Sequence, residues 1–276
     1  MSNWKKTVVR YTPPQVVHWG KCLLNADYRR RAHHLNQLKR FPRFQPTTTN
    51  IFGKPFEVPD APTFLSNFYP IFHQQIYGFH AKTERPYILD CGANIGLSVV
   101  YFKQLYPEST VIAFEADKSI FEVLRNNVQS LGYNDVKVVN RAVWNGETEL
   151  NFTSDGGDGG RLSVSNDHPT QVVKTVRLRD RLDRKIDFLK LDIEGAETAV
   201  LQDCADQLRN VESLFVEYHS FADEPQSLHL LMDVLADAGF RVHIQAPMPA
   251  PQPFIKRQPV MGMDMQLNIF AFRPDA

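Results

Sequence analysis

Apolar positions follow two alternating periods in the part of the chain that begins at Pro86. Short apolar runs typical of covered strands alternate with segments whose apolar residues recur every three or four positions, as on one face of a helix. Strands that alternate with helices predict a parallel sheet with helices on both faces. The predicted strands cover residues 87–93, 109–117, 136–143, 187–194, 212–219, 240–246 and 266–272, and the predicted helices cover 95–105, 119–131, 196–208 and 226–238.

Two regions interrupt this alternation. Residues 147–153 and 172–180 are more polar strand candidates on either side of a glycine-rich loop, residues 154–163, which we expect to lie over a substrate with Arg161 contacting an anionic group. The last two strands have no helix between them, only a segment rich in proline and methionine. They therefore predict an antiparallel hairpin at one edge of the sheet.

The first part of the chain has no such regularity, because prolines divide it into short pieces. Residues 22–41 fit an amphipathic helix, residues 50–60 fit a hairpin around Gly53, and the aromatic residues of 64–80 suit a packing surface. We therefore expect an N-terminal helical and irregular extension over residues 1–82, as a cover or substrate-side region, and an α/β domain over 83–276.

Composition limits the classes of partner. The chain has 276 residues, of which 43% are hydrophobic, and 31 basic residues balance 31 acidic ones. Nucleic-acid-binding domains usually carry a basic excess, so no nucleic-acid partner is expected. The locally basic stretch from Arg29 to Arg43 fits a solvated helix face or a cover over the main domain, with an anionic ligand as the alternative.

Cysteine usage and hydropathy bear on the cellular compartment. Cys22, Cys91 and Cys204 are few and lack CxxC spacing, which favours a reducing compartment and argues against a structural zinc site. The sequence shows neither a signal-peptide pattern nor an apolar stretch long enough to span a bilayer. These features predict a cytoplasmic protein.

The loop "DCGANIG" after the first strand is the first candidate for ligand binding, because ligands of open α/β sheets bind at the carboxyl ends of the strands. Its G-x-x-x-G spacing differs from the G-x-G-x-x-G of dinucleotide sites. Asp90 would repel a phosphate and suits an ammonium group, and Glu115 at the end of the second strand can accept hydrogen bonds from two ribose hydroxyls. A nucleoside with a cationic amino-acid tail, S-adenosylmethionine, fits this combination.

Several motifs together resemble the FkbM-type S-adenosylmethionine-dependent methyltransferases. They are "ILDCGANIGLSVVYF", "VIAFEAD", "VVNRAVWN", "VKTVRLRDRL", "IDFLKLDIEGAE" and "LFVEYH", in this order. The resemblance implies a Rossmann-like, mostly parallel seven-stranded class I methyltransferase sheet and methyl transfer to a hydroxyl of a small saccharide or natural product. It implies cofactor roles for Asp90, Gly92, Ala93, Asn94, Gly96, Glu115, Ala116 and Asp192, and an adenine site lined by Ala142 and Val143.

The acidic strand end "FLKLDIEGAE" supplies the candidates for catalysis. Alternation puts Lys190, Asp192 and Glu194 on one face, and it puts Glu217 and His219 together on the strand that is adjacent in the methyltransferase order. Four ionisable groups, Lys190, Asp192, Glu217 and His219, would then converge near the methyl donor.

An alcohol acceptor must lose its proton to a base within hydrogen-bonding reach. We expect Asp192 to orient the acceptor or lie near the sulfonium, His219 to be the base, and Lys190 to steady the carboxylates or lower the acceptor pKa. A divalent cation held by Asp192, Glu217 and His219 is an alternative that the sequence does not favour. Glu194 and Glu197 flank Gly195 where a helix starts, a position at which carboxylates cap the helix.

Two other function classes remain as rivals. An NAD(P)-dependent Rossmann oxidoreductase would share the sheet but not the G-x-x-x-G spacing or the edge hairpin. A non-catalytic S-adenosylmethionine-binding module would keep the cofactor loop without turnover. The acceptor, the metal dependence and a homodimer are left open by the sequence.

Overall fold

The computed structural model describes residues 26–153, 160–162, 171–248, 252–255 and 259–274. The chain divides into two compact units, Met1–Ser66 and Asn67–Ala276. Cys22, most of the glycine-rich loop and the side chain of Arg161 lie outside the described part. None of the described helices is both long and apolar enough to cross a bilayer.

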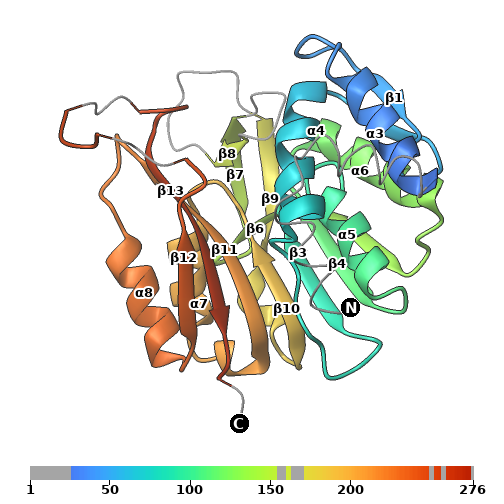
Figure 1. Cartoon of the computed structure of the whole chain (residues 1–276). Helices are drawn as coiled ribbons and strands as arrows, with labels where there is room; N and C mark the ends of the chain where they lie inside the picture. Colours follow the sequence, from blue (N-terminus) through green and yellow to red (C-terminus); the bar gives the residue numbers. More distant parts are fainter. Residues whose placement is uncertain (1–25, 154–159, 163–170, 249–251, 256–258, 275–276) are drawn as a thin grey trace, which may run out of the picture. The chain divides into compact units, whose positions relative to one another are not determined.

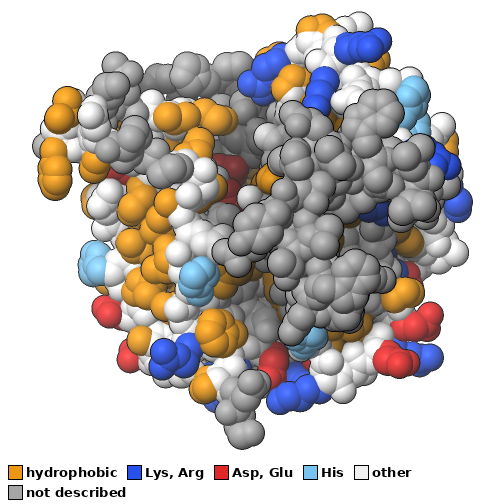
Figure 2. All heavy atoms as spheres, in the orientation of Figure 1, with side chains coloured by type: hydrophobic (Ala, Val, Ile, Leu, Met, Phe, Trp, Pro, Cys, Tyr) orange, Lys and Arg blue, Asp and Glu red, His pale blue; other side chains and the backbone are white. Residues whose placement is uncertain are grey.

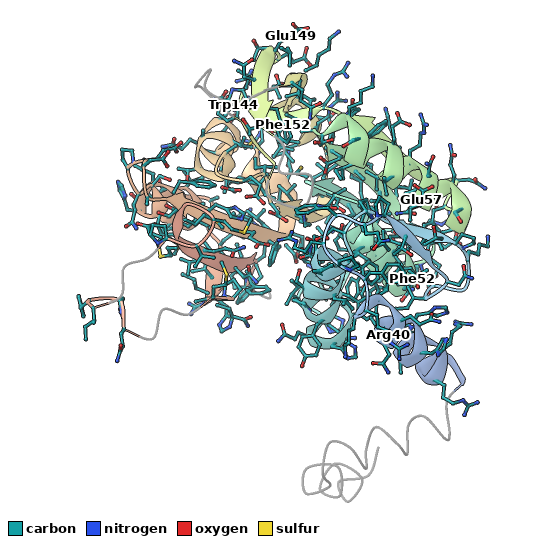
Figure 3. All side chains as sticks on the ribbon, turned by 90° about the horizontal axis from the view of Figure 1, so that it is seen from above. Arg40, Phe52, Glu57, Trp144, Glu149 and Phe152 are labelled. Carbon is teal, nitrogen blue, oxygen red and sulfur yellow. The ribbon has the colours of Figure 1, made fainter. Side chains whose placement is uncertain are left out.

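The first unit contains the helix and the hairpin that the sequence predicts. Helix α3 covers Ala26–Leu38, and strands β1 (Thr47–Thr49) and β2 (Phe56–Val58) pair in antiparallel register. Phe52 lies in the turn between the strands (Figure 3). Its ring makes an edge-to-face contact with Phe56 at 5.1 Å between ring centroids. The buried Phe56 and the hairpin give this unit a small apolar core of its own.

The second unit is built on a seven-stranded sheet in the order β12-β13-β11-β10-β3-β4-β5 (Figure 1). Only β13 is antiparallel to its two neighbours, so the predicted mostly parallel sheet with an antiparallel edge hairpin is confirmed. The strands are β3 (Tyr87–Cys91), β4 (Thr110–Glu115), β5 (Val136–Asn140), β10 (Ile186–Leu191), β11 (Val211–Phe221), β12 (Arg241–Gln245) and β13 (Met263–Phe272).

Helices lie in the predicted connections between the strands. They are α5 (Leu97–Leu105), α6 (Lys118–Leu131), α7 (Glu197–Cys204) and α8 (Leu228–Asp237), preceded in the chain by α4 (Ala61–Phe68) and the π-helical turn η1 (Tyr69–Gln74). Two short 3₁₀ turns, η2 (Leu178–Arg181) and η3 (Leu208–Asn210), also lie in the described part of the chain. Figure 1 shows α5 and α6 beside β3 and β4, and α7 with α8 beside β11 and β12.

The central strand β10 shows how the two sheet faces differ. Leu189 and Leu191 belong to the core that packs against α7 and α8. Phe188 points the other way and packs on Phe102 of α5, with 5.3 Å between ring centroids. Lys190 follows Phe188 on the α5 face by strand alternation. One face of the sheet is therefore an apolar core, and the other carries charged side chains toward the ends of the strands.

The aromatic segment that follows Ser66 packs within the second unit. The ring of Tyr77 lies 4.9 Å from that of Phe215, and the ring of Phe79 lies 4.7 Å from that of Phe188. These contacts explain why the division between units falls at Ser66 rather than at residue 82, where the regular pattern of the sequence starts. The prediction that these aromatic residues form a packing surface is confirmed for Tyr77 and Phe79, whereas Tyr69 is exposed.

The strand predicted over residues 136–143 is two strands. Asn140 ends β5, and its side-chain amide donates to the carbonyl oxygens of Glu115 and Ala116 at 3.0 and 3.1 Å. The chain turns at Arg141 and continues into a separate four-stranded sheet in the order β6-β9-β7-β8. Trp144 and Phe152 belong to this small sheet (Figure 3). Its strands are β6 (Ala142–Trp144), β7 (Glu149–Thr153), β8 (Arg161–Leu162) and β9 (Gln171–Arg177).

Candidate functional site

The loop between β3 and α5 makes a turn that only glycine can begin. Gly92 has a φ of +84°, and a Cβ atom built there would lie 1.8 Å from the carbonyl oxygen of Asp192. The N–H of Asp192 donates to the carbonyl oxygen of Cys91 at 3.1 Å. The side chain of Lys190 donates to the carbonyl oxygen of Gly92 at 2.7 Å. The backbone of the loop after β3 is thus in direct contact with the backbone of the turn after β10.

Glu115 ends β4 beside this loop, as the sequence predicts. Its two carboxylate oxygens accept from the backbone N–H groups of Asn94 and Asp117, both at 2.9 Å. Burial raises the pKa of Glu115 to about 7, although these two hydrogen bonds oppose the shift. Each oxygen accepts one backbone hydrogen bond. Since a carboxylate oxygen can accept two, each can accept one more from a ligand.

Asp90 lies under the glycine loop and is fully buried. Its Oδ2 accepts from the hydroxyl of Ser98 at 2.5 Å, while Oδ1 has no hydrogen-bond partner among the described residues and lies 3.6 Å from Nζ of Lys190. Burial raises the pKa of Asp90 despite the neighbouring Lys190. The buried carboxylate therefore keeps one acceptor oxygen unfilled.

The other residues expected at a cofactor site lie in the loop after β3 and in two apolar clusters. Asn94 has a left-handed backbone with φ of +48°, and Gly96 with φ of +97° is the residue before α5. Ala93 is buried in the loop, and Ala116 packs on the small apolar cluster that contains Ala142. Val143 belongs to the main core of the sheet. Ala142 and Ala116 are thus neighbours, while Val143 also has a structural role.

The turn after β10 departs from the predicted strand. The strand ends at Leu191, and Glu194 and Gly195 have left-handed backbones with φ of +56° and +101°. Strand alternation therefore does not reach Glu194. Asp192 nevertheless remains beside Lys190, with 3.0 Å between Oδ2 and Nζ.

His219 connects this turn to strand β11. Its Nδ1 lies 3.1 Å from Oε1 of Glu197, and the same oxygen accepts from the N–H groups of Ile193 and Gly195 at 3.0 and 3.1 Å. Nε2 of His219 lies 3.7 Å from Oε2 of Glu194 and 3.9 Å from Oε1 of Glu217. We call this group, defined by the residues Asp192, Glu194, Glu197, Glu217 and His219, the carboxylate–histidine cluster.

Burial and neighbouring charges shift the pKa of several groups in the cluster. Burial raises the pKa of Glu194 to about 8 and that of Glu217 to about 7. Burial alone would lower the pKa of His219, but the charge and hydrogen bond of Glu197 raise it well above its ordinary value. The charge of Asp192 raises the pKa of Lys190 well above its ordinary value, against the effect of burial. Figure 2 shows acidic side chains recessed at this end of the sheet.

Three residues in or beside the cluster make contacts that were not predicted from the sequence. Glu197 is the buried partner of His219 as well as the first residue of α7. Gln266 of β13 donates its side-chain N–H to Glu217. Tyr77 is buried with its ring centroid 5.9 Å from Nζ of Lys190, and burial raises the pKa of its hydroxyl well above the ordinary value. No local motif marks these contacts, because the partners are distant in the sequence.

The comparisons with known proteins agree with this fold. A family model described as the methyltransferase FkbM domain matches residues 90–242, more than half of the chain. The solved structure of a methyltransferase FkbM from Methylobacillus flagellatus KT superposes with a TM-score of 0.51 at 15% identity. That match covers 74% of this chain and 48% of the other, so it spans about half of the solved protein and supports the fold alone.

Two curated relatives are more similar in sequence. The chain is 25% identical over 208 residues to "Methyltransferase 1" of Beauveria bassiana (strain ARSEF 2860), covering 66% of this chain and 82% of the relative. It is 26% identical over 168 residues to "2-O-methyltransferase NoeI" of Sinorhizobium fredii (strain NBRC 101917 / NGR234), covering 53% of this chain and 68% of the relative.

Proposed function

The chain belongs to the FkbM methyltransferase family, and on that premise we propose that it transfers the methyl group of S-adenosylmethionine to a hydroxyl of a small saccharide or natural product. The observation that carries the proposal is the position of the carboxylate–histidine cluster. Lys190 contacts both the carbonyl oxygen of Gly92 in the glycine loop and the carboxylate of Asp192. Groups that can receive a proton therefore lie next to the loop that would hold the methyl donor.

The residues of the loop fit S-adenosylmethionine. Glu115 has acceptor capacity left on both carboxylate oxygens, which suits the two ribose hydroxyls. Asp90 has a buried oxygen without a hydrogen-bond partner, which suits the ammonium group of the amino-acid tail. The cofactor, when bound, supplies an electrophilic methyl group on a sulfonium. The negative cluster favours that positive charge nearby.

The side chains of the cluster and Lys190 have separate roles in the proposed methyl transfer. Asp192 orients the acceptor by accepting a hydrogen bond from its hydroxyl, because much of the catalysis of methyl transfer is positioning. Glu217 receives the proton of that hydroxyl, and Gln266 holds its carboxylate in place. His219, fixed through Nδ1 by Glu197, presents Nε2 to the same space. Lys190 offsets the charge of Asp192 and Asp90.

Two observations favour a hydroxyl as the group that accepts the methyl. The relative from Sinorhizobium fredii is named a 2-O-methyltransferase, and the cluster supplies the base that an alcohol needs and an electron-rich amine does not. The balance of 31 basic and 31 acidic residues gives no general attraction for nucleic acid. We therefore expect a small molecule as acceptor.

Thermal unfolding with two ligands tests the cofactor. S-adenosylhomocysteine at 100 times its Kd should stabilise the folded protein by about 2.7 kcal/mol, because a ligand that binds only the folded state stabilises it by mass action. NAD at the same concentration should leave the melting temperature unchanged. Stabilisation by NAD alone would overturn the proposal. Binding of S-adenosylhomocysteine without methyl transfer to any member of a saccharide panel would favour a non-catalytic binding module.

The titration of Glu115 gives a second, pH-dependent test. Ribose hydroxyls donate to the ionised carboxylate, so ligand binding and protonation of Glu115 compete. Because the pKa of Glu115 is about 7, the affinity for the ligand is highest above pH 7. At lower pH the affinity decreases by up to about tenfold per pH unit. The probe is 5′-methylthioadenosine, which has the ribose but no ammonium group. In Glu115→Gln its binding should be weaker, and the part of the pH dependence due to Glu115 should disappear. The same pH profile in both proteins would exclude this role.

A further inference from the structure

We propose that the carboxylate–histidine cluster holds a divalent cation, with Asp192, Glu194 and His219 as its protein ligands. One potential ligand atom from each of these residues lies within 4.8 Å of the other two. Asp192 and Glu194 come from the turn after β10, and His219 comes from β11, so two neighbouring strands supply the set. A modest closure of the side chains would bring the three atoms to metal-binding distance.

The buried imidazole is the second observation that points to an ion. The side chain of His219 is only 2% exposed, and Nδ1 is committed to Glu197. Nε2 has no hydrogen-bond partner among the described residues, and its nearest carboxylate oxygens, at 3.7 and 3.9 Å, are beyond hydrogen-bonding distance. The buried imidazole thus directs Nε2 toward two carboxylates at ion-pair distance, without a hydrogen bond to either.

Glu197 gives the ring the setting that metal-binding histidines usually have. Such a histidine donates its second ring N–H to a carboxylate, which fixes the tautomer and the orientation of the ring. Oε1 of Glu197 makes this contact and also accepts the N–H groups of Ile193 and Gly195. One carboxylate therefore positions both the imidazole and the turn that carries Asp192 and Glu194. Glu197 is a positioning residue for the site.

The structure also changes the ligand set that the sequence offers. The sequence offers Asp192, Glu217 and His219 as an alternative metal site, whereas the atoms that lie close together belong to Asp192, Glu194 and His219. Glu217 is held by Gln266. It remains beside the proposed ion as a base and is not needed as a ligand.

The donor atoms indicate the class of ion. Two carboxylates with one imidazole and no thiolate suit a hard to borderline divalent ion such as Mn²⁺ or Mg²⁺. A dication would also balance the negative charge that Lys190 does not offset. In the proposed methyl transfer, an open coordination position on the ion would bind the acceptor hydroxyl and lower its pKa. This catalytic role rests on the proposed function, whereas binding of the ion does not.

The test is a titration of the full chain with Mn²⁺ alone, followed by electron paramagnetic resonance of the free ion. We expect saturable binding of one ion per chain. Glu197→Gln should weaken that binding by about 10- to 100-fold, the usual cost of losing a residue that orients a metal ligand. Glu194→Gln and His219→Ala should weaken it at least as much. Asp264→Asn, which changes an exposed carboxylate of β13, should leave it unchanged.

Two results would overturn the cation site: no saturable Mn²⁺ binding by the unsubstituted chain, or the same affinity in Glu194→Gln and His219→Ala as in Asp264→Asn. Circular dichroism of each variant verifies that the chain is folded. Since Mn²⁺ is titrated without cofactor or acceptor, the result is independent of the thermal shift with S-adenosylhomocysteine. Failure of one experiment therefore does not imply failure of the other.

Discussion

Gly92→Ala is expected to abolish binding of S-adenosylhomocysteine and to lower the free energy of unfolding by roughly 3–5 kcal/mol. The added Cβ would lie 1.8 Å from the carbonyl oxygen of Asp192, and the φ of +84° is itself unfavourable for alanine. The atom in conflict belongs to the backbone, so a side-chain movement cannot relieve it. If the turn after β10 moved away from the added Cβ, the hydrogen bond from the N–H of Asp192 to the carbonyl oxygen of Cys91 would break.

Denaturant-induced unfolding measures this effect, and Gly146→Ala is the matched control. A Cβ at Gly146 meets no atom within 4 Å, so the same chemical change should alter stability by no more than about 0.5 kcal/mol. Equal unfolding midpoints for the two variants would mean that the loop after β3 and the turn after β10 are not in the close contact described above.

Asp192→Asn is expected to lower kcat by roughly 100-fold or more while the protein still binds S-adenosylhomocysteine. The amide keeps nearly the same shape but loses the charge that pairs with Lys190 and that orients the acceptor hydroxyl. S-adenosylhomocysteine carries no sulfonium, so its binding depends little on that charge.

Methyl transfer from labelled S-adenosylmethionine to an acceptor found in a saccharide panel measures the loss, and equilibrium binding of S-adenosylhomocysteine is measured in parallel. Asp233→Asn, an exposed position on α8, controls for a general effect of the substitution. Unchanged turnover in Asp192→Asn would remove Asp192 from the catalytic residues. A parallel loss of turnover and of binding would assign it to the cofactor site instead.

The sheet and the glycine loop could be predicted because their signals are local. Apolar periodicity identifies each strand from its own residues, and the glycine spacing around Gly92 and Gly96 identifies the turn. Asp90 and Glu115 follow from their places at the strand ends. None of these inferences needs a contact between distant parts of the chain.

The detailed geometry of the cluster could not be predicted because it depends on such contacts. Strand alternation predicts that Lys190, Asp192 and Glu194 share a face, but the strand ends at Leu191, where the chain turns against the loop after β3. Glu197 was expected to cap a helix and does accept backbone N–H groups, yet its contact with His219 joins residues that are 22 positions apart. Tyr77 lies in an aromatic segment that gives no sign of its nearness to Lys190.

The position of β13 has a consequence for the order in which the protein is made. Strand β13 lies between β12 and β11 and pairs with β11 from Ser213 to Phe221, although it follows both in the sequence. Until residue 272 has left the ribosome, β11 has an unpaired edge, and Glu217 lacks Gln266. An unpaired edge of a long apolar strand invites pairing with other chains. The nascent chain therefore carries an edge prone to aggregation until this strand has been made.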